Sequence, residues 1–263
     1  MIAPKIQDLY DYYISIKNDE NSEQRYKGKE KYYHASGAYS CRRKLYFESV
    51  LVAEKTNAPK NIDYRKMRLG TVFHNEMEDC FNFLNSQPSN KTLSKTVTNT
   101  ITSIPSSILN SIPRDFKVHQ EKEIIIDELN VRGFYDLVLE MNNGEIYLYD
   151  FKTMGAFPWK KKFGKLAPPS KPSKYEFQLG TYGYAVKKEF GRLDGMFLVY
   201  YNKDTSVMRQ VPVNLNYVSI AYQHWREVNS HHEQGMPKLE KKLSPVEAWE
   251  CNYCAYKDAC DKI

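Results

Sequence analysis

The sequence has no long apolar run: no stretch of about 18 apolar residues occurs among its 263 positions, so no membrane-spanning helix is expected. Its N-terminus also lacks the basic segment followed by an apolar one that marks a signal peptide. Cysteine is scarce, with five copies, and we interpret these as ligands or core residues before disulfides. We therefore expect a chain that works in the cytoplasm, in that of a host cell if the gene is viral, without a membrane partner.

The composition favours one main domain that acts on a polyanion. A chain of 263 residues can bury about 75% of the surface of its unfolded form, which is enough for one core with appendages. The net charge of +6 favours a polyanionic partner over a neutral metabolite. The 21 tyrosines suit both core packing and stacking on bases.

The pattern of apolar residues predicts an α/β core with a mixed central sheet flanked by helices. This core should span residues 61–235, with an insertion at 86–118 that is rich in Ser, Thr, Asn and Pro. An N-terminal segment, 1–60, and a cysteine-rich segment, 236–263, flank the core. Within it we expect helices at 62–84, 176–190 and about 215–234, and strands near 123–126 and at 131–140, 145–152, 193–201 and 207–213.

Two carboxylates and a lysine occupy one predicted β-hairpin. Its strands contain Asp136 and, after a turn at 142–144, Asp150 and Lys152. A turn centred on Asn143 puts Asp136 directly opposite Asp150, and alternation then puts Lys152 on the same face. A slip of one residue would separate them, so this prediction depends on the register. Two carboxylates beside a lysine can bind a hard divalent cation and activate water against a phosphodiester.

The alternative interpretation is that this hairpin lies at the edge of the sheet and that its charged residues face solvent without a catalytic role. Against it, Asp150 lies in the largely apolar stretch 147–151, where a carboxylate without a partner is costly. His74, on the helix at 62–84, is either a satisfied structural residue or a third ligand, if that helix packs beside the hairpin.

Two other side chains share a face of the helix at 176–190. Gln178 and Tyr182 are four residues apart, so both point to the same side. Pairs of this kind are common on amphipathic helices and mean little alone. Because they follow Lys152 closely, we expect them to hold a phosphate or to orient the lysine.

The cysteines form the most specific local pattern, Cys251-x2-Cys254-x5-Cys260. Three clustered thiolates leave a tetrahedral or cubane site one ligand short, and Cys41 can complete it across space. Zinc and an iron–sulfur cluster both fit four cysteines, and either would hold the terminal segments together. Cys80 has the spacing of a helical core residue, so we expect it to be buried.

Residues 153–175 combine six lysines with no acidic residue. This stretch is either a solvated linker or a groove for single-stranded nucleic acid, in which cations follow the backbone and rings stack on bases. Because it follows Lys152 directly, we expect it to bind nucleic acid. The candidate contacts are Lys160, Lys161, Lys162, Lys165 and Trp159.

In combination, these motifs resemble the RecB-like branch of the PD-(D/E)XK nuclease superfamily. The pattern of that family is a helix with G-x3-H, followed by G-x2-D, (D/E)-x-K and Q-x3-Y. The cysteines add a narrower resemblance to the iron–sulfur nucleases of CRISPR adaptation modules and to the AddB nuclease. In this chain the four motifs occur in order as Gly70 to His74, Gly133 to Asp136, Asp150 to Lys152 and Gln178 to Tyr182.

The resemblance implies a restriction-endonuclease-like core that hydrolyses DNA with Mg²⁺ or Mn²⁺. It makes His74, Asp136 and Asp150 ligands of the metal, with the Phe151 carbonyl as a fourth. Lys152 would orient or deprotonate the attacking water. Gln178 and Tyr182 would complete the catalytic site.

The resemblance also implies that Cys41, Cys251, Cys254 and Cys260 hold a [4Fe-4S] cluster. Two features depart from the family: the insertion at 86–118, and Asp150 where many relatives have Glu, which shortens the reach of the carboxylate. We expect an exonuclease on single-stranded DNA or duplex ends, working in recombination, repair or CRISPR-type processing beside a protein partner of that system. The alternatives are a catalytically silent DNA-binding scaffold and a zinc-stapled endonuclease.

Overall fold

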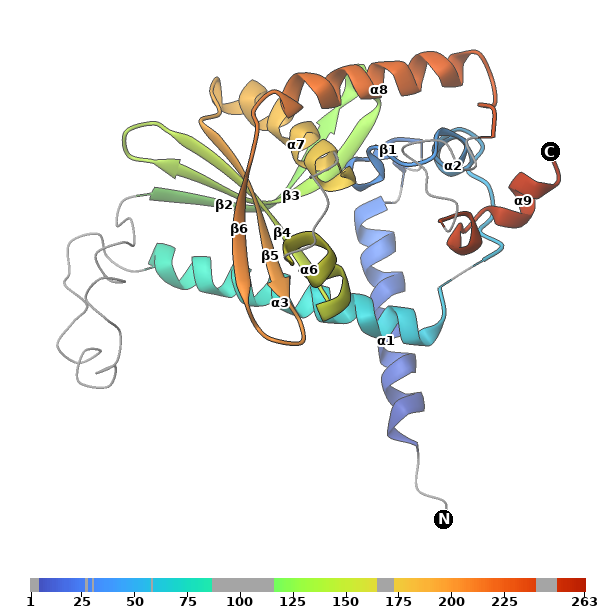
Figure 1. Cartoon of the computed structure of the whole chain (residues 1–263), viewed down its shortest axis with the longest axis horizontal. Helices are drawn as coiled ribbons and strands as arrows, with labels where there is room; N and C mark the ends of the chain where they lie inside the picture. The colour runs from blue at the N-terminus through green and yellow to red at the C-terminus, as the bar shows by residue number, and fades with distance from the viewer. Residues whose placement is uncertain are drawn as a thin grey trace.

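The computed structural model describes residues 5–26, 28–29, 31–57, 59–86, 116–164, 173–239 and 250–263 (Figure 1). Its α-helices are α1 (Ile6–Tyr26), α2 (Arg42–Leu45), α3 (Asn61–Ser86), α6 (Ala156–Phe163), α7 (Lys174–Phe190), α8 (Tyr217–Glu233) and α9 (Lys257–Asp261). Shorter helical turns are η1 (Ala35–Gly37), η2 (Tyr46–Val50), η3 (Asp127–Leu129) and η4 (Glu250–Tyr253). The strands are β1 (Tyr33–His34), β2 (Phe116–Ile126), β3 (Val131–Met141), β4 (Ile146–Met154), β5 (Gly195–Asn202) and β6 (Met208–Val213). None of the described helices is long and apolar enough to span a membrane.

The strands form a mixed sheet in which β3 has neighbours on both edges. On one edge, β2 runs antiparallel along nearly the whole of β3. On the other edge, β1 pairs in parallel with the start of β3, and β4 pairs antiparallel with its second half. The sheet continues from β4 to β5, in parallel, and from β5 to β6, antiparallel. A mixed central sheet flanked by helices confirms the predicted core.

The β3–β4 hairpin has the predicted register. Leu137 pairs with Tyr149, which gives the hairpin the centre that the turn sequence indicated. Gly144 has a φ of +82°, so it supplies the left-handed residue that lets the chain reverse. One step beyond the last pair, the same register sets Asp136 opposite Asp150.

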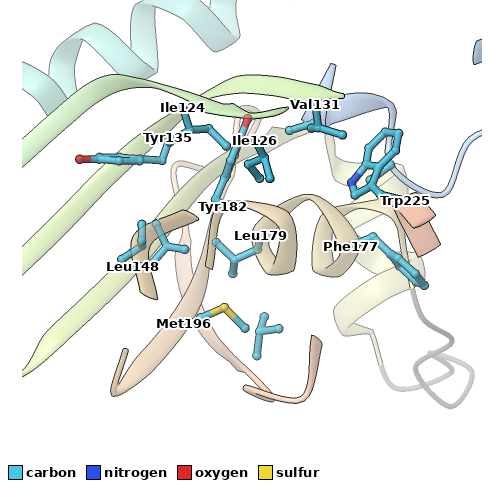
Figure 2. Packing of buried hydrophobic residues seen from close by; sticks show 14 of the residues in the cluster. Ile124, Ile126, Val131, Tyr135, Leu148, Phe177, Leu179, Tyr182, Met196 and Trp225 are labelled. Carbon is cyan, nitrogen blue, oxygen red and sulfur yellow. The ribbon is translucent and has the colours of Figure 1, made fainter. Parts of the chain in front are cut away.

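Helices cover both faces of the sheet (Figure 1). On one face α7 packs against the strands and α8 covers α7, while α3 lies on the other face. Under α7 lies the larger apolar cluster, where Tyr182 points toward the strands that carry Ile124 and Val131 (Figure 2). The smaller cluster, under α3, consists of Phe73, Leu137, Leu139, Phe151 and Val199.

Strand β2 exchanges its two faces near Glu121. Residues separated by an even number normally share a face of a strand. Nevertheless, Val118 packs in the cluster under α3 and Ile124 in the cluster under α7. Glu121 lies between them with a left-handed φ of +44°. Its rung with Asp136 is the one missing from an otherwise continuous ladder between β2 and β3.

Strand β3 exchanges its faces at the same rung. Tyr135 belongs to the cluster under α7, whereas Leu137 belongs to the cluster under α3. Asp136 lies between them, opposite Glu121. Glu121 and Asp136 therefore lie at the rung where both strands exchange the faces of their side chains. For this reason, the alternation of side chains along either strand does not predict to which face these two carboxylates point.

Most predicted elements are confirmed, but some details differ. Residues 116–118 belong to β2, not to the predicted insertion, and residues 87–115 of that insertion lie outside the described residues. No helix was predicted in the stretches that form α1 and α6. The prediction that Cys80 is buried was wrong, since Cys80 is exposed. Helix α3 buries the row Phe73, Met77 and Phe81 against the sheet, and Cys80 lies beside that row.

Candidate catalytic and metal site

The candidate catalytic site lies where β3 and β4 separate. Backbone pairing between these strands ends at Leu137 and Tyr149. Beyond it, the Phe151 amide donates a hydrogen bond of 2.6 Å to Asp136 Oδ2, so a side chain takes over from the main chain. The strands thus part at the pair formed by Asp136 and Asp150, and the start of β3 pairs with β1 instead.

Helix α3 brings His74 to this branching point. Its Nε2 lies 3.1 Å from the Phe151 carbonyl oxygen, and because a carbonyl can only accept, Nε2 carries the hydrogen. The lone pair of Nδ1 is then 3.6 Å from Asp136 Oδ1. Gly70, one turn earlier, faces β4, where an added Cβ would make only an ordinary contact, 3.4 Å from Thr153 Oγ1. His74 and Asp136 are brought together as the motifs predict, whereas the Phe151 carbonyl accepts from His74.

Glu121 joins this pair, although no motif predicted it. One ligand atom from each of His74, Glu121 and Asp136 lies within 4.8 Å of the other two, and among the described residues no other set of His, Cys, Asp or Glu does so. We call these three residues the donor group. Two carboxylates and a neutral imidazole suit Mn²⁺ or Mg²⁺, and their facing lone pairs are what a cation stabilises. A single glutamate on a polar strand segment is no recognisable signal, so only the β2–β3 register reveals it.

Asp150 lies against Lys152, outside the donor group. Its side chain is fully buried, and its carboxylate forms an ion pair with Lys152 Nζ. Beyond that pair, neither carboxylate oxygen has a hydrogen-bond partner among the described residues. The Lys152 ammonium also lies 5.4 Å from the centre of the Tyr175 ring on α7. The two residues of the D-x-K motif therefore satisfy each other's charge.

Gln178 and Tyr182 approach the site from α7. Gln178 Nε2 donates to Tyr182 Oη at 3.1 Å, and both side chains are buried. Tyr182 rests on β3 at Gly133, where an added Cβ would lie 2.8 Å from Tyr182 Cε1. This separation is shorter than real Cβ contacts allow, so the position requires glycine. Gly133 thus provides the packing space for Tyr182, three residues before Asp136.

Burial and neighbouring charges set the protonation states of the site. Burial, and after it the charge of Asp150, raises the pKa of Asp136 well above its usual range. Burial lowers the pKa of His74 and the charge of Lys152 lowers it further, so the imidazole stays in the neutral form that binds metals. Burial alone would lower the pKa of Lys152, but the charges of Asp150 and Asp136 raise it above the ordinary value. Lys152 therefore remains a cation.

A model of the PD-(D/E)XK nuclease superfamily matches residues 33–261. The chain belongs to this superfamily. The matched range covers most of the chain and includes all four motifs, so the resemblance drawn from the sequence is confirmed. Comparison with curated proteins finds no match.

Solved structures resemble this PD-(D/E)XK protein at low sequence identity. The crystal structure of SSO0001 is 16% identical, covers 98% of each chain and has a TM-score of 0.51, a likeness of fold alone. A protein from Eubacterium rectale described as an exonuclease is 14% identical over 80% of this chain and 83% of its own, with a TM-score of 0.41. The alkaline exonuclease LHK-Exo from Laribacter hongkongensis is 13% identical over 84% of this chain and 97% of its own, with a TM-score of 0.39.

Helix α6 of this PD-(D/E)XK core carries most of the predicted nucleic-acid contacts. Lys160 and Lys161 are exposed, and both are available to a ligand. Lys162 is partly buried, and its Nζ lies 5.0 Å from the centre of the Tyr200 ring. Lys165 lies outside the described residues. Two of the predicted lysines therefore form an open cationic surface, and Lys162 stacks on the protein itself.

The aromatic residue on the open side of α6 is Phe157, not the predicted Trp159. Trp159 is partly buried against the core, with its ring centre 4.7 Å from that of Phe163. Phe157 is 80% exposed on the first turn of the helix. Asp204 holds this turn by accepting a 2.6 Å hydrogen bond from the Ala156 amide. The lysine-rich stretch thus presents one free ring, five residues after Lys152.

The C-terminal segment packs against residues near Cys41. The rings of Phe47 and Tyr256 stack with their centres 5.8 Å apart, and Tyr256 is buried. Arg43, two residues after Cys41, has its Nη1 3.6 Å from Cys260 Sγ. Segments more than 200 positions apart in the sequence therefore form one unit beside the core (Figure 1).

The four candidate cluster ligands are free cysteines of intermediate burial, namely Cys41, Cys251, Cys254 and Cys260. Within the described residues, no three of their sulfurs gather inside 4.8 Å. One zinc ion draws its four sulfurs close together, because each zinc–sulfur bond is about 2.3 Å long. A cubane holds its cysteine sulfurs farther apart, since four irons lie between them. As a set of donors, the four thiolates fit either group.

Proposed function

We propose that the chain is a metal-dependent DNA nuclease that acts as an exonuclease on single-stranded DNA or duplex ends. The observation that carries the proposal is the lone pair of His74 Nδ1 at 3.6 Å from Asp136 Oδ1, beside the buried pair of Asp150 and Lys152. A divalent cation bound there would neutralise a scissile phosphate and lower the pKa of a water molecule. Membership of the nuclease superfamily supports the same conclusion.

The protein's own groups would divide the remaining work. Lys152 would orient the attacking water and offset the negative charge of the phosphate, because its raised pKa keeps it charged. The same raised pKa argues against Lys152 as the general base in this state. Tyr182 would stay protonated, since burial raises its pKa, and its hydroxyl could donate to a phosphate oxygen.

Helix α6 is the proposed contact with the nucleic acid. Lys160 and Lys161 would follow the phosphate backbone, and the exposed Phe157 ring could stack on a base. Binding through single-strand stacking favours free ends over continuous duplex.

The test is cleavage of end-labelled single-stranded DNA by anaerobically purified protein, with Mn²⁺ or Mg²⁺ and with neither. Wild type is compared with Lys152→Ala and with Lys188→Ala, which removes an exposed lysine that pairs with Glu128 on the protein surface. We expect metal-dependent degradation by wild type and Lys188→Ala, and none by Lys152→Ala. A circular single strand should resist cleavage.

Two outcomes would point to the alternatives. Cleavage of the circular strand would indicate an endonuclease. DNA binding without cleavage under either metal would indicate a silent DNA-binding scaffold and would overturn the proposed activity.

We also propose that Cys41, Cys251, Cys254 and Cys260 hold a [4Fe-4S] cluster with a structural role. Its four thiolates would tie the C-terminal segment to the helix after Cys41, where Arg43 already reaches Cys260. The same four-cysteine pattern supports a place in recombination, repair or CRISPR adaptation, with a protein partner from that system.

The cluster proposal predicts about four irons per chain and no stoichiometric zinc in the anaerobic sample. Cys254→Ser should lose iron and loosen the packing of the C-terminal segment. The hydrogen bond of 3.0 Å that the Thr56 amide donates to the Ala255 carbonyl should then open more often. Hydrogen exchange at Thr56 should therefore accelerate. One zinc per chain would indicate that the four cysteines hold zinc and not a cluster. Unchanged hydrogen exchange at the Thr56 amide would contradict the structural role.

A further inference from the structure

Glu121 occupies a strained position in the middle of β2. Its φ of +44° is left-handed, in a strand whose neighbouring rungs on both sides are regular. Glutamate is not among the residue types that favour a left-handed backbone. Strain of this kind persists only where the surrounding structure imposes it. Glycine, the residue that would relieve the strain, is absent at this position. Such strain is a pointer to function rather than to stability.

The strained conformation directs Glu121 toward the site. At the rung of Glu121 and Asp136 both strands exchange faces, as the clusters on either side of the sheet demonstrate. The Glu121 carboxylate consequently joins His74 and Asp136, with one ligand atom of each within 4.8 Å of the others. A regular β conformation at this residue would continue the alternation of β2 and would not reverse the strand. The strain and the donor group are therefore two aspects of one arrangement.

The site has a use for an additional long carboxylate. Asp150 has a short side chain, is fully buried and is engaged by Lys152. It lies outside the donor group, in which His74 supplies nitrogen and Asp136 supplies oxygen. Even with Asp150 as a third protein donor, a divalent cation that prefers six or more ligands has room for another carboxylate. Glu121 supplies such a carboxylate from the opposite strand.

We propose that Glu121 is a direct ligand of the catalytic cation, in addition to the residues of the sequence motifs. The proposal rests on the nuclease function proposed above, and it assigns a role to a residue outside all four sequence motifs. In this arrangement Glu121 binds the cation together with His74 and Asp136, beside the pair of Asp150 and Lys152. The strain at Glu121 is the structural cost of bringing that carboxylate to the metal.

The test measures Mn²⁺ binding by isothermal titration calorimetry, in the absence of DNA, on wild type, Glu121→Gln and Glu123→Gln. Glu123 is a matched control because it lies on the same strand and pairs with Lys29, at 2.6 Å, away from the donor group. Loss of partners that only support a metal site weakens affinity by about 10 to 100-fold, so loss of a direct ligand should weaken it at least about tenfold. We expect that loss in Glu121→Gln and wild-type affinity in Glu123→Gln. Wild-type affinity in Glu121→Gln would overturn the proposal.

A second variant separates metal binding from folding. Glu121→Gly removes the carboxylate and also accepts a φ of +44° without strain, so it should fold even if Glu121→Gln does not. We expect a thermal midpoint at or above that of wild type, with Mn²⁺ affinity lowered at least about tenfold. A lower midpoint with unchanged Mn²⁺ affinity would assign Glu121 a structural role and overturn the proposal.

Failure of this inference is distinguishable from failure of the proposed function. If wild type binds Mn²⁺ with the Glu121 dependence above but cleaves no DNA, the ligand assignment stands and the nuclease activity falls. If wild type cleaves DNA and Glu121→Gln binds Mn²⁺ and cleaves equally well, the activity stands and the assignment falls. If wild type binds no Mn²⁺, both fall.

Discussion

The backbone amide of Phe151 donates a hydrogen bond of 2.6 Å to the carboxylate of Asp136, across the point where their two strands part. This bond occupies Oδ2 and fixes the carboxylate, while Oδ1 lies 3.6 Å from His74 Nδ1. The main chain of one motif therefore orients the acidic residue of another. The arrangement also holds Asp136 near Asp150, and that proximity has a cost in stability.

Asp136→Asn should abolish cleavage and leave the protein at least as stable as wild type. Burial and the charge of Asp150 raise the pKa of Asp136 above its unfolded value, so its ionised form is disfavoured in the folded state at neutral pH. The asparagine oxygen can still accept from Phe151, and the repulsion is removed. We expect at least about a hundredfold loss of activity with Mn²⁺, and urea unfolding should give an equal or higher free energy of unfolding. Mn²⁺ should stabilise wild type but not the variant.

The control for Asp136→Asn is Asp127→Asn, which neutralises an exposed carboxylate while its asparagine oxygen can still accept from the Tyr32 hydroxyl. It should leave cleavage unchanged. A large loss of stability in Asp136→Asn would contradict the expected direction of the stability change and would make the carboxylate a structural group.

Lys152→Met should destabilise the fold by about 3 kcal/mol, because it leaves the charge of fully buried Asp150 without a partner. Replacing the pair together, as Asp150→Asn with Lys152→Met, should restore most of that stability, since neither member of the pair is then a charge without a partner. Neither variant should cleave DNA. A double-mutant cycle by urea unfolding measures the coupling, and additive effects of the two substitutions would show that the ion pair does not hold in solution.

The hairpin was predictable because its information is local. The turn at 142–144 and the β-forming residues around it fix the register, and the register brings Asp136 opposite Asp150. The helix that carries His74 was predictable from its apolar period, although its packing beside β4 was only a condition of the prediction. These features depend on residues that are close in sequence or on motifs whose order is known.

The features that sequence reasoning missed depend on tertiary structure. Glu121 enters the site through a left-handed conformation that no nearby glycine announces. Cys80 has core spacing, but α3 buries only the row next to it. On α6, Trp159 faces the core and Phe157 faces solvent. Which residue is buried depends on the side of this short helix that packs against the core.

Gly133→Ala should lower the free energy of unfolding by about 1–3 kcal/mol, the range typical of overpacked cores. The new Cβ would lie 2.8 Å from Tyr182 Cε1 and 3.0 Å from Ala35 Cβ, so α7 or η1 must shift. Because Asp136 is three residues away on the same strand, cleavage should fall as well. Urea unfolding and the single-strand assay measure the two effects.

Gly70→Ala is the matched control for that substitution. Its Cβ would meet Thr153 Oγ1 at 3.4 Å, a mild contact, and alanine favours the helix more than glycine does. Its stability should stay within about 1 kcal/mol of wild type. Equal destabilisation by both substitutions would mean that the contact with Tyr182 is not what requires glycine at position 133.

The stability of the protein should fall between pH 7 and pH 5, in part because of His224. Burial, with a smaller effect of Arg42, lowers the pKa of His224 to about 4, and its Nε2 accepts a 3.0 Å hydrogen bond from the Tyr39 amide. A neutral buried histidine contributes stability above its unfolded pKa of about 6.5, and this is lost as the pH falls toward the folded value. By pH 5 the loss should be about 2 kcal/mol. His224→Gln keeps an acceptor for Tyr39 and cannot gain the proton, so the pH dependence of urea unfolding should flatten by that amount. His231→Gln, at an exposed position of the same helix, is the control, and equal slopes in wild type and His224→Gln would exclude His224 as the source.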